Sequence, residues 1–356
     1  MKKKILIFGA GAIGRGFVAP LFYRNNYEIN FVDSNVKLVD KLNKKKKYFV
    51  GVIKNNKYEF HEINVKKTFK LNEKIKVNDF DLVVSCVGIN NCYKNFEYYK
   101  DAKHLISCEN DINTVSRLKK LSRNKNIFFG IPDVITSNTA PKKILIKDDL
   151  TVISENGILV LEKFTKNLPN EIEFVSKKDL EKHWVSKLYI HNAPHAIAAY
   201  LGYLKKYIFV HESMKNKKIK KIVQGSIKEI ADGLINCKII DKKFAYYYMY
   251  KELKRFSNKL LYDPISRVAR DPIRKLSKND RLIKAIQISL YNNKLPSNCA
   301  IGILAALNYY DKKDSQSQHL KLMIENFGKE YVMEKVCGLE KDDPLIKFCL
   351  SQKINI

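Results

Sequence analysis

The stretch Lys4-Ile5-Leu6-Ile7-Phe8-Gly9-Ala10-Gly11-Ala12-Ile13-Gly14-Arg15-Gly16 decides the fold of this chain. A short apolar run of strand type leads into glycines spaced G-x-G-x-x-G, and a helical pattern follows to about Arg24. In this setting glycines permit a tight turn and let backbone N–H groups approach a pyrophosphate at the start of a helix. The stretch therefore predicts a strand, a turn and a helix that bind a dinucleotide.

An acidic residue completes this pattern. A second strand over 28–32 ends at Asp33, about 20 residues after the glycines, as in a Rossmann-type domain. We expect Asp33 to bind the adenosine ribose 2′-OH and to repel a 2′-phosphate, which favours NAD over NADP. The predicted cofactor-binding residues are Ile5, Phe8, Gly9, Ala10, Gly11, Ala12, Ile13, Gly14, Arg15, Gly16, Asp33 and Gly88.

Further strands are predicted in the first half of the chain. Residues 48–53 and 58–63 form a hairpin turning at Asn55-Asn56, buried strands cover 81–86, 104–107 and 126–129, and 151–164 and 171–175 finish the sheet as antiparallel strands. Ligands bind outside the carboxyl ends of parallel strands, where Gly88 and Asn110 follow two of these strands. Asn110 either faces the nicotinamide or caps the next helix, and the local sequence leaves both readings open.

Helical periodicity dominates after residue 177. Helices are predicted over 179–207, 218–236, 242–261, 280–291, 299–309, 316–327 and 330–338, with a last one starting at Asp343-Pro344. The predicted fold is therefore α/β, with a Rossmann-type NAD-binding domain in residues 1–177 and an all-α substrate domain in 178–356.

Composition narrows the class of protein. The formal net charge is +29, but only nine of the 66 basic residues are arginine and the lysines are spread along the chain, so a nucleic-acid partner is not expected. The seven cysteines form no CxxC pair, which disfavours a disulfide framework and a zinc site. No apolar run has the roughly 18 residues of a membrane span. We expect a cytoplasmic monomer or homodimer without a metal.

The stretch Lys187-Leu-Tyr-Ile-His191-Asn192-Ala-Pro194-His195 concentrates polar chemistry within an apolar helical segment. At 100° per residue, Lys187, His191 and His195 share one face of an α-helix, whereas Asn192 lies about 140° from Lys187. Pro194 should break or kink the helix and free Asn192 and His195 to face a cleft. A buried lysine can act as a base because burial lowers its pKa.

These residues resemble a known family. The pattern Lys187-x4-Asn192-x2-His195 is similar to the signature of the polyol-specific long-chain dehydrogenases. The resemblance extends over the whole chain through 9–17, Ser107-Cys108-Glu109-Asn110 and the block 267–284, which begins Arg267-Val-Ala-Arg270. Asp133 matches an acid that an arginine usually follows in the family, but Val134 follows it here. The role of that acid is therefore open.

The resemblance implies a metal-independent hydride transfer between mannitol 1-phosphate and fructose 6-phosphate with NAD. Lys187 would act as general base and acid, Asn110 and Asn192 would donate hydrogen bonds to the developing oxyanion, and His195 would hold a neighbouring hydroxyl. Because Asn110 precedes the predicted boundary and Lys187 follows it, the chemistry would lie where the two domains meet. His191 is outside the signature and is expected to be structural.

The distribution of the arginines independently indicates a phosphate-binding site. Five of the nine lie within 255–281, where a planar guanidinium would suit a bidentate grip on phosphate. An ordinary ion-pair network is the alternative explanation. The candidate ligands of the sugar phosphate are Arg267, Arg270, Arg274, Lys275, Arg281 and Lys284.

Three other functions remain open from the sequence. The enzyme could act on an unphosphorylated polyol or a sugar acid, which the arginine cluster disfavours. A basic nucleic-acid-binding Rossmann protein would show salt-steep binding and no NADH oxidation. A non-catalytic NAD sensor would leave the pattern from Lys187 to His195 without a purpose.

Overall fold

The computed structural model describes residues 2–142, 144–145, 148–162, 168–169 and 171–356. The chain divides into two compact units, residues 1–184 and 185–356, and each is described by itself. The domain boundary expected after residue 177 coincides with the start of helix α5 (Lys177–Val185), and the division into units falls near the end of that helix.

The first unit is built on a mainly parallel sheet. Among the described residues its eight strands have the order β12-β11-β8-β7-β6-β1-β2-β5. The strands from β8 to β5 run parallel, and β11 lies antiparallel to β8. Their bounds are β1 Lys4–Phe8, β2 Glu28–Asp33, β5 Lys67–Lys70, β6 Leu82–Ser85, β7 Leu105–Ser107, β8 Ile127–Asp133, β11 Ile158–Glu162 and β12 Ile172–Val175.

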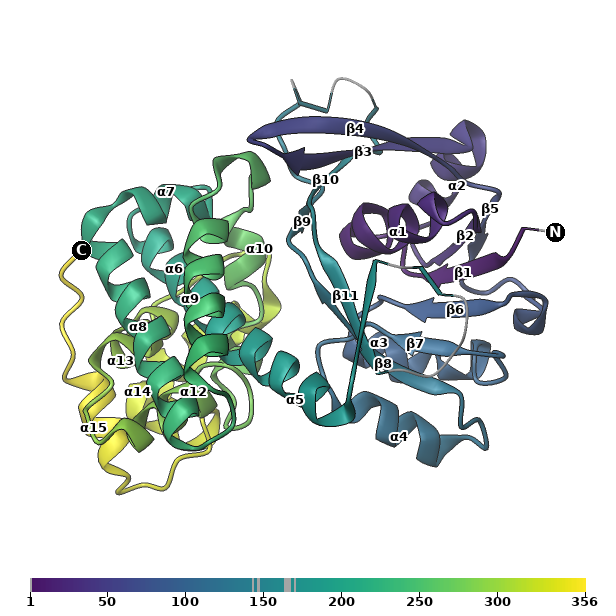
Figure 1. Ribbon diagram of the computed structural model, residues 1–356. Coiled ribbons are helices and arrows are strands. Elements are labelled where there is room, and N and C mark those ends of the chain that lie inside the picture. Colours follow the sequence, from purple (N-terminus) through teal and green to yellow (C-terminus); the bar gives the residue numbers. More distant parts are fainter. Residues whose placement is uncertain (1, 143, 146–147, 163–167, 170) are drawn as a thin grey trace. The chain divides into compact units, whose positions relative to one another are not determined.

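Strand β1 is apolar on both sides because both faces of this sheet are covered. Ile5 and Ile7 pack into one hydrophobic core together with Phe31, and Leu6 and Phe8 pack into another. A continuous apolar run is the expected sequence of such a central parallel strand. Figure 1 shows β1 between β2 and β6, and this is where the strand order reverses. Such a reversal is the usual ligand site of an open parallel sheet.

A second sheet was not anticipated. Its described strands are β4 (Lys57–Asn64), β3 (Lys47–Lys54), β10 (Val152–Glu155) and β9 (Thr136–Ser137), in that order. The hairpin β3–β4 is confirmed, and Asn55 and Asn56 take positive φ angles of 48° and 59° in its turn.

The strand expected over 151–164 was wrong in part. It is interrupted at Gly157, and only β11 joins the main sheet, whereas β10 pairs in parallel with β3. A Cβ on Gly157 would lie 2.7 Å from the Asp133 carbonyl oxygen, so the break in the strand brings the two backbones close together.

The helices of the first unit are short. Asn35 caps α2 by accepting a hydrogen bond from the Leu38 amide at 3.2 Å. A π-helical segment, η1 (Gly14–Val18), precedes α1, and its turn includes a bond from the Ala19 amide to the Gly14 carbonyl. The α-helices are α1 Ala19–Arg24, α2 Val36–Lys45, α3 Ile89–Lys94 and α4 Asn113–Leu121, with 3₁₀ turns at Val77–Asp79 and Phe96–Tyr98.

The second unit is helical, as the sequence predicts. Its described elements are η4 Ser186–Asn192 (a π-helix), α6 Ala193–Leu204, α7 Val210–Lys215, α8 Lys217–Asn236, α9 Lys242–Phe256, α10 Ile265–Ala269, α11 Pro272–Leu276, α12 Ile283–Ser289, α13 Ser297–Ala306, α14 Ser315–Lys335 and α15 Pro344–Leu350, with 3₁₀ turns at Lys259–Leu261 and Leu290–Asn292. Helices α7, α10 and α11 were not anticipated, since each is too short to show a clear apolar period.

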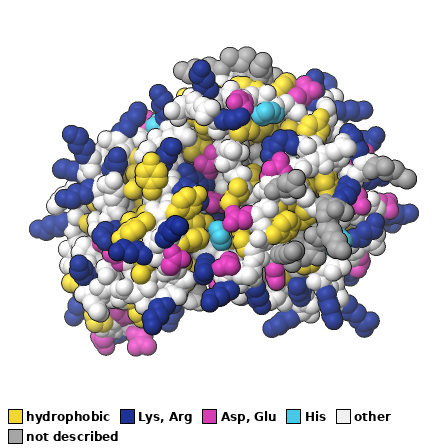
Figure 2. Space-filling model, in the orientation of Figure 1, with side chains coloured by type: hydrophobic (Ala, Val, Ile, Leu, Met, Phe, Trp, Pro, Cys, Tyr) yellow, Lys and Arg dark blue, Asp and Glu magenta, His cyan; other side chains and the backbone are white. Residues whose placement is uncertain are grey.

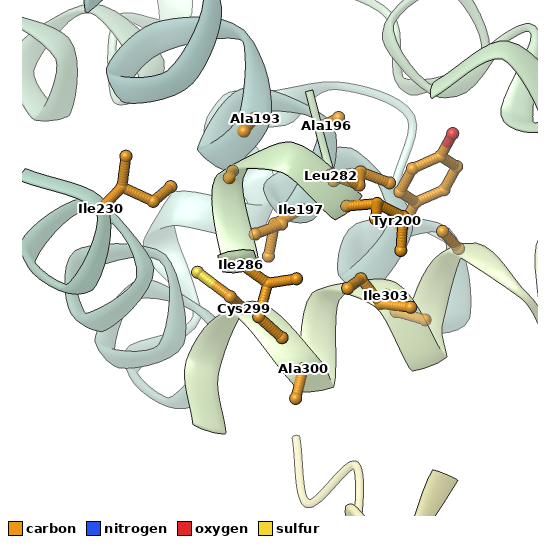
Figure 3. Close-up of a cluster of buried hydrophobic side chains, with 14 of the residues drawn as sticks. Ala193, Ala196, Ile197, Tyr200, Ile230, Leu282, Ile286, Cys299, Ala300 and Ile303 are labelled. Atoms are coloured by element: carbon orange, nitrogen blue, oxygen red, sulfur yellow. The ribbon is translucent and has the colours of Figure 1, made fainter. Parts of the chain in front are cut away.

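Helix α6 is the centre of this unit. It is buried along most of its length and packs on α8, α10 and α13. Figure 3 shows Ala193, Ala196, Ile197 and Tyr200 of α6 among side chains from α8, α12 and α13 and from Leu282 just before α12. Alanines let neighbouring helices approach closely, so α6 and the residues just before it have a fixed place in the core.

Candidate active-site residues

The three glycines of the first turn have different tasks. Gly9 has a φ of 97°, and a Cβ there would lie 2.7 Å from the Cys86 carbonyl oxygen. A Cβ on Gly14 would lie 2.0 Å from the Gly9 carbonyl oxygen, so this glycine lets the helix pack on the turn. Gly11 has no atom within 4 Å of its Cβ position, which leaves space for a ligand beside the start of the helix. Such a cradle, with amides at a helix N-terminus, suits a pyrophosphate.

Asp33 at the end of β2 holds this turn. Its carboxylate accepts hydrogen bonds from the amides of Ala10 and Asn35, both at 2.8 Å. Arg15 turns its side chain inward, since its guanidinium donates to the carbonyls of Ala10 and Leu150. Burial lowers the pKa of Arg15 from its ordinary value. In this structure the Arg15 side chain thus supports the turn and the β10 region, and a role for Arg15 in cofactor binding stays a prediction.

The other predicted cofactor residues differ in accessibility. Ile5 and Phe8 are fully buried core residues, Ala12 and Ile13 are half-buried at the start of the helix, and Gly16 packs on Val152. Gly88 has a φ of 87° and no atom within 4 Å of its Cβ position, so it leaves open space after β6.

A buried carboxyl group lies beside Gly88. Glu109, 4% exposed, accepts hydrogen bonds from the Ser85 hydroxyl at 2.7 Å and the Val87 amide at 2.9 Å. Burial raises the pKa of Glu109. The Glu109 carboxyl group therefore links the end of β7 to the end of β6. The sequence alone did not predict this contact.

Asn110 is exposed in the bend after β7. It does not cap the next helix, because α4 begins at Asn113 with Ile112 at the capping position. The Asn113 amide is bound instead by the Asp111 carboxylate, at 3.0 Å. The capping alternative is thus removed, and the role of Asn110 at the oxyanion stays a prediction.

Lys187 and Asn192 lie in the π-helical segment η4. Hydrogen bonds in a π-helix join residues five apart, so residue i+5 lies one turn above residue i. Lys187 and Asn192 are five apart and therefore lie on the same side of the segment, unlike in an α-helix. The wider turn, rather than a kink, brings the two side chains to one face.

The expected break at Pro194 was wrong. Asn192 and Ala193 keep right-handed helical angles, with φ of −66° and −70°, and Pro194 lies in the first turn of α6. Pro194 directly follows the π-helical segment, so the change from the wide turn of η4 to the α-helix falls at the proline and the chain continues without a break.

The Asn192 amide offers a hydrogen-bond donor. Its Nδ2 atom is buried and has no hydrogen-bond partner among the described residues. Leaving a buried donor unpaired costs about 1–3 kcal/mol, and such sites are often functional. The geometry is suited to donating to an oxygen that is not part of the protein.

His195 is paired with a buried carboxylate. Its Nε2 atom lies 3.0 Å from Oδ2 of Asp263, whose Oδ1 accepts two hydrogen bonds from Arg267, at 2.9 and 2.5 Å. Burial alone would raise the pKa of Asp263, but Arg267 and His195 outweigh it and hold the pKa at about 2. The Phe256 ring stacks on His195 at 4.8 Å. Asp263 and Phe256 together fix the orientation of the imidazole.

His191 has a different partner. Its Nδ1 atom contacts Oε2 of the fully buried Glu252, which also accepts hydrogen bonds from Arg255 at 2.9 and 3.0 Å. This pairing agrees with the structural role expected of His191.

The six candidate phosphate ligands separate into two groups. Arg267 is bound to Asp263, the Arg270 side chain is 64% exposed and Lys284 is exposed. Arg274, Lys275 and Arg281 form a cluster, because Arg274 and Arg281 both contact Asp280, at 3.0 and 2.8 Å, and the Leu282 amide, next to Arg281, donates to the Lys275 carbonyl. The structure thus contains an ion-pair network in which Lys275 lies between two arginines along the backbone.

Several supporting residues escaped the sequence analysis. The pairs Asp263–Arg267 and Glu252–Arg255 have the i,i+4 and i,i+3 spacing of helical ion pairs, which could have identified them. Nothing local connects them to His195 and His191. Among the described residues there is no group of three His, Cys, Asp or Glu side chains that could hold a metal. No described helix is long and apolar enough to cross a bilayer.

Comparison with known proteins covers nearly the whole chain. Residues 3–126 match the mannitol dehydrogenase Rossmann domain, and residues 179–336 match the mannitol dehydrogenase C-terminal domain. A mannitol-1-phosphate 5-dehydrogenase of Caldanaerobacter subterraneus subsp. tengcongensis is 33% identical over 97% of this chain and 96% of its own length. A second, from Buchnera aphidicola subsp. Baizongia pistaciae, is 32% identical over 99% of both chains.

Solved structures show the same fold. The Pseudomonas fluorescens mannitol 2-dehydrogenase, in a ternary complex with NAD and D-mannitol, superposes with a TM-score of 0.76 over 98% of this chain and 90% of its own, at 15% identity. A substrate-free D-sorbitol dehydrogenase gives a TM-score of 0.68 over 98% of this chain and 92% of its own, at 16% identity.

Proposed function

Because the chain belongs to the mannitol dehydrogenase family, we propose that it is an NAD-dependent mannitol-1-phosphate 5-dehydrogenase. It would interconvert D-mannitol 1-phosphate and D-fructose 6-phosphate without a metal. The observation that carries the proposal is the common face of Lys187 and Asn192 in η4, with the Asn192 amide buried and without a partner among the described residues.

The glycine turn fits the cofactor. Gly11 is open to a ligand, and the amides that follow it start a helix, so this cradle suits the NAD pyrophosphate. When bound, NAD supplies the hydride acceptor for the carbinol carbon. Asp33 carries its negative charge at the end of β2, where a 2′-phosphate would be repelled. NAD is therefore the proposed cofactor.

Lys187 is the proposed general acid and base. In the oxidation it takes the proton from the C5 hydroxyl, and in the reduction it returns a proton to the developing alkoxide. The Asn192 Nδ2 group donates to the same oxygen and stabilises the charge that forms there.

His195 is proposed to hold a neighbouring hydroxyl of the substrate. Its Nε2 atom pairs with Asp263, which sets the orientation of the ring and leaves Nδ1 as the other polar atom. Asn110 is proposed, from the sequence, as a second donor to the oxyanion.

A turnover assay tests this proposal. NADH oxidation is followed with fructose 6-phosphate for wild type, Lys187→Ala and the control Lys205→Ala, an exposed lysine at the end of α6. Lys187→Ala should lower kcat by about 10²–10⁴-fold because general acid–base catalysis is lost. Lys205→Ala should match wild type. Equal rates for all three proteins would remove Lys187 as the base.

Two alternative functions are tested with other substrates and with a binding measurement. Turnover of mannitol in preference to mannitol 1-phosphate would identify a dehydrogenase of unphosphorylated polyols. A lack of NADH oxidation together with salt-steep RNA or DNA binding would favour a nucleic-acid-binding protein. The visible face in Figure 2 has Lys and Arg side chains distributed widely rather than gathered in one patch, which favours the enzyme.

A further inference from the structure

Lys275 lies in a setting that is unfavourable for a lysine. It is in α11, 4% exposed, and its side-chain ammonium group has no hydrogen bond or ion pair to any described residue. Burying an ammonium group without a counter-ion is costly, so such a lysine tends to lose its proton. Replacing it with an apolar residue would favour folding, and its presence therefore calls for another explanation.

The groups around Lys275 are mostly basic. Arg274 lies beside it on α11 and Arg281 just before α12, and both guanidinium groups contact Asp280. Asp271, at the start of α11, lies 3.6 Å from Arg274, and its own amide is bound by Asp314 at the start of α14. The guanidinium groups of Arg274 and Arg281 thus have carboxylate partners in Asp271 and Asp280, whereas the Lys275 ammonium group has no ion pair to any described residue. A bound anion would give the Lys275 ammonium group a counter-ion.

The backbone holds this cluster together. The Leu282 amide donates to the Lys275 carbonyl at 3.2 Å, which closes the loop that carries Asp280 and Arg281. Arg281 is 8% exposed and the Arg274 amide donates to Gln316 of α14 at 2.9 Å. Lys275 and Arg281 are therefore held in buried positions on fixed elements, and Arg274 is exposed beside them.

The charges of the cluster act on η4 and α6. Burial and then the charge of Asp280 raise the pKa of Tyr189, in η4, to about 12. On α6, burial raises the pKa of Tyr200 and the charge of Arg281 opposes this rise. The Asp280–Arg281 pair thus influences the segment that carries Lys187.

We propose that Arg274, Lys275 and Arg281 form the subsite for the substrate phosphate, and that Lys275 takes up a proton from solvent when the dianion binds. This inference rests on the proposed function, because it assigns a subsite to the sugar phosphate. Before binding, burial and the neighbouring Arg281 and Arg274 lower the pKa of Lys275 well below its ordinary value. A bound dianion favours the charged form. The amine then gains one proton from water or buffer, and no covalent bond to phosphorus forms or breaks.

The other three candidate phosphate ligands are not part of the proposed subsite. Arg267 is bound to Asp263 and supports His195. Arg270 and Lys284 are exposed and belong to the surface of the unit.

Calorimetry with sulfate tests the proton uptake directly. Sulfate has the charge of the phosphate dianion but no proton to exchange near neutral pH, so any uptake belongs to the protein. Titrations at pH 8 in two buffers of different ionisation enthalpy should show net proton uptake by the wild type. Sulfate binding without uptake would mean that Lys275 is already charged, and the protonation step would be wrong.

Variants test the subsite. Lys275→Met should abolish the uptake and raise the KM for fructose 6-phosphate by about 10–100-fold, the effect of losing a charged hydrogen bond, with a much smaller change in kcat. Lys278→Met is the matched control, because Lys278 is exposed on the same loop and its alkyl chain packs on Gly338. An unchanged KM for Lys275→Met would overturn the subsite. A thermal melt checks folding, and Lys275→Met should melt no lower than wild type without ligand, since it removes a buried amine.

The two proposals fail differently. If wild type binds sulfate with proton uptake but does not oxidise NADH with fructose 6-phosphate, the proposed function is wrong and the anion site stands. If wild type turns over fructose 6-phosphate and Lys275→Met does so with the same KM, the function stands and the subsite is wrong.

Discussion

The two π-helical segments, η1 in the first unit and η4 in the second, have the same wide turn but differ in the burial of their side chains. Residues Gly14–Val18 of η1 are all buried, and the open space beside this element lies at Gly11, where a side chain is missing. In η4 the polar side chains of Lys187 and Asn192 share one face and are only partly buried. We therefore propose that the first element acts through its backbone and the second through its side chains.

This difference predicts which substitutions each element tolerates. An element that presents its backbone should lose ligand affinity or stability when a side chain is added, because the new atoms fill the space for the ligand or clash with the turn. An element that presents side chains is harmed when one is removed. The predictions that follow test this contrast.

After Lys187→Ala, the largest effect is expected for Asn192→Ala in η4. Removing one donor to a developing oxyanion lowers kcat by about 10²–10³-fold, and NADH oxidation with fructose 6-phosphate measures it. Because the Asn192 Nδ2 atom has no partner among the described residues, its loss should not lower the melting temperature.

Asn308→Ala is the matched control, because it removes an asparagine whose loss should affect stability rather than activity. The Asn308 Nδ2 group donates to the Leu304 carbonyl at 2.7 Å, so its loss should reduce stability by up to about 1 kcal/mol and leave kcat unchanged. If Asn192→Ala kept full activity and melted at a lower temperature, Asn192 would be structural.

A pair of glycine substitutions tests η1 and its turn. Gly14→Ala places a Cβ 2.0 Å from the Gly9 carbonyl oxygen, and we expect a loss of about 2–3 kcal/mol in the free energy of unfolding, measured in urea. Gly11→Ala meets no atom within 4 Å, so stability should stay within about 0.5 kcal/mol of wild type.

NADH affinity separates the two glycines further. Gly11→Ala should weaken binding by about tenfold or more, measured by fluorescence titration, because its methyl group enters the space proposed for the pyrophosphate. Wild-type affinity in a stable Gly11→Ala protein would show that the cofactor does not lie against this turn.

The last prediction concerns Asp263, which acts through His195. The folded pKa of about 2 lies below the ordinary value of about 3.9, so the ionised carboxylate stabilises the fold above that ordinary value, and this stability is lost as the pH falls towards 2. Asp263→Asn should therefore lose about 2 kcal/mol at pH 7. The deficit should shrink between pH 4.5 and 3.

Unfolding curves at pH 7, 4.5 and 3 measure this change. A deficit of constant size at all three pH values would show that packing, rather than charge, holds Asp263 in place. The activity of Asp263→Asn is a second measurement. Without the Asp263 carboxylate His195 should be misoriented, and kcat should fall by less than it does in Asn192→Ala.

The sequence determined the fold class and supplied the candidate site residues. The strand before Gly9, the glycine spacing and Asp33 are local patterns, and the structure confirms β1, the turn and β2 within one residue. The pattern from Lys187 to His195 is also contained in nine residues. Local patterns of this kind reflect backbone preferences and side-chain periodicity, which act over one or two turns.

Only the tertiary structure decided how these residues are supported. The second sheet, the wide turn of η4, the pairing of His191 with Glu252 and of His195 with Asp263, and the burial of Lys275 all depend on residues far apart in the chain. The cost of burying a charge is set by the groups that surround it after folding, so one lysine among many can be singled out only in the folded protein.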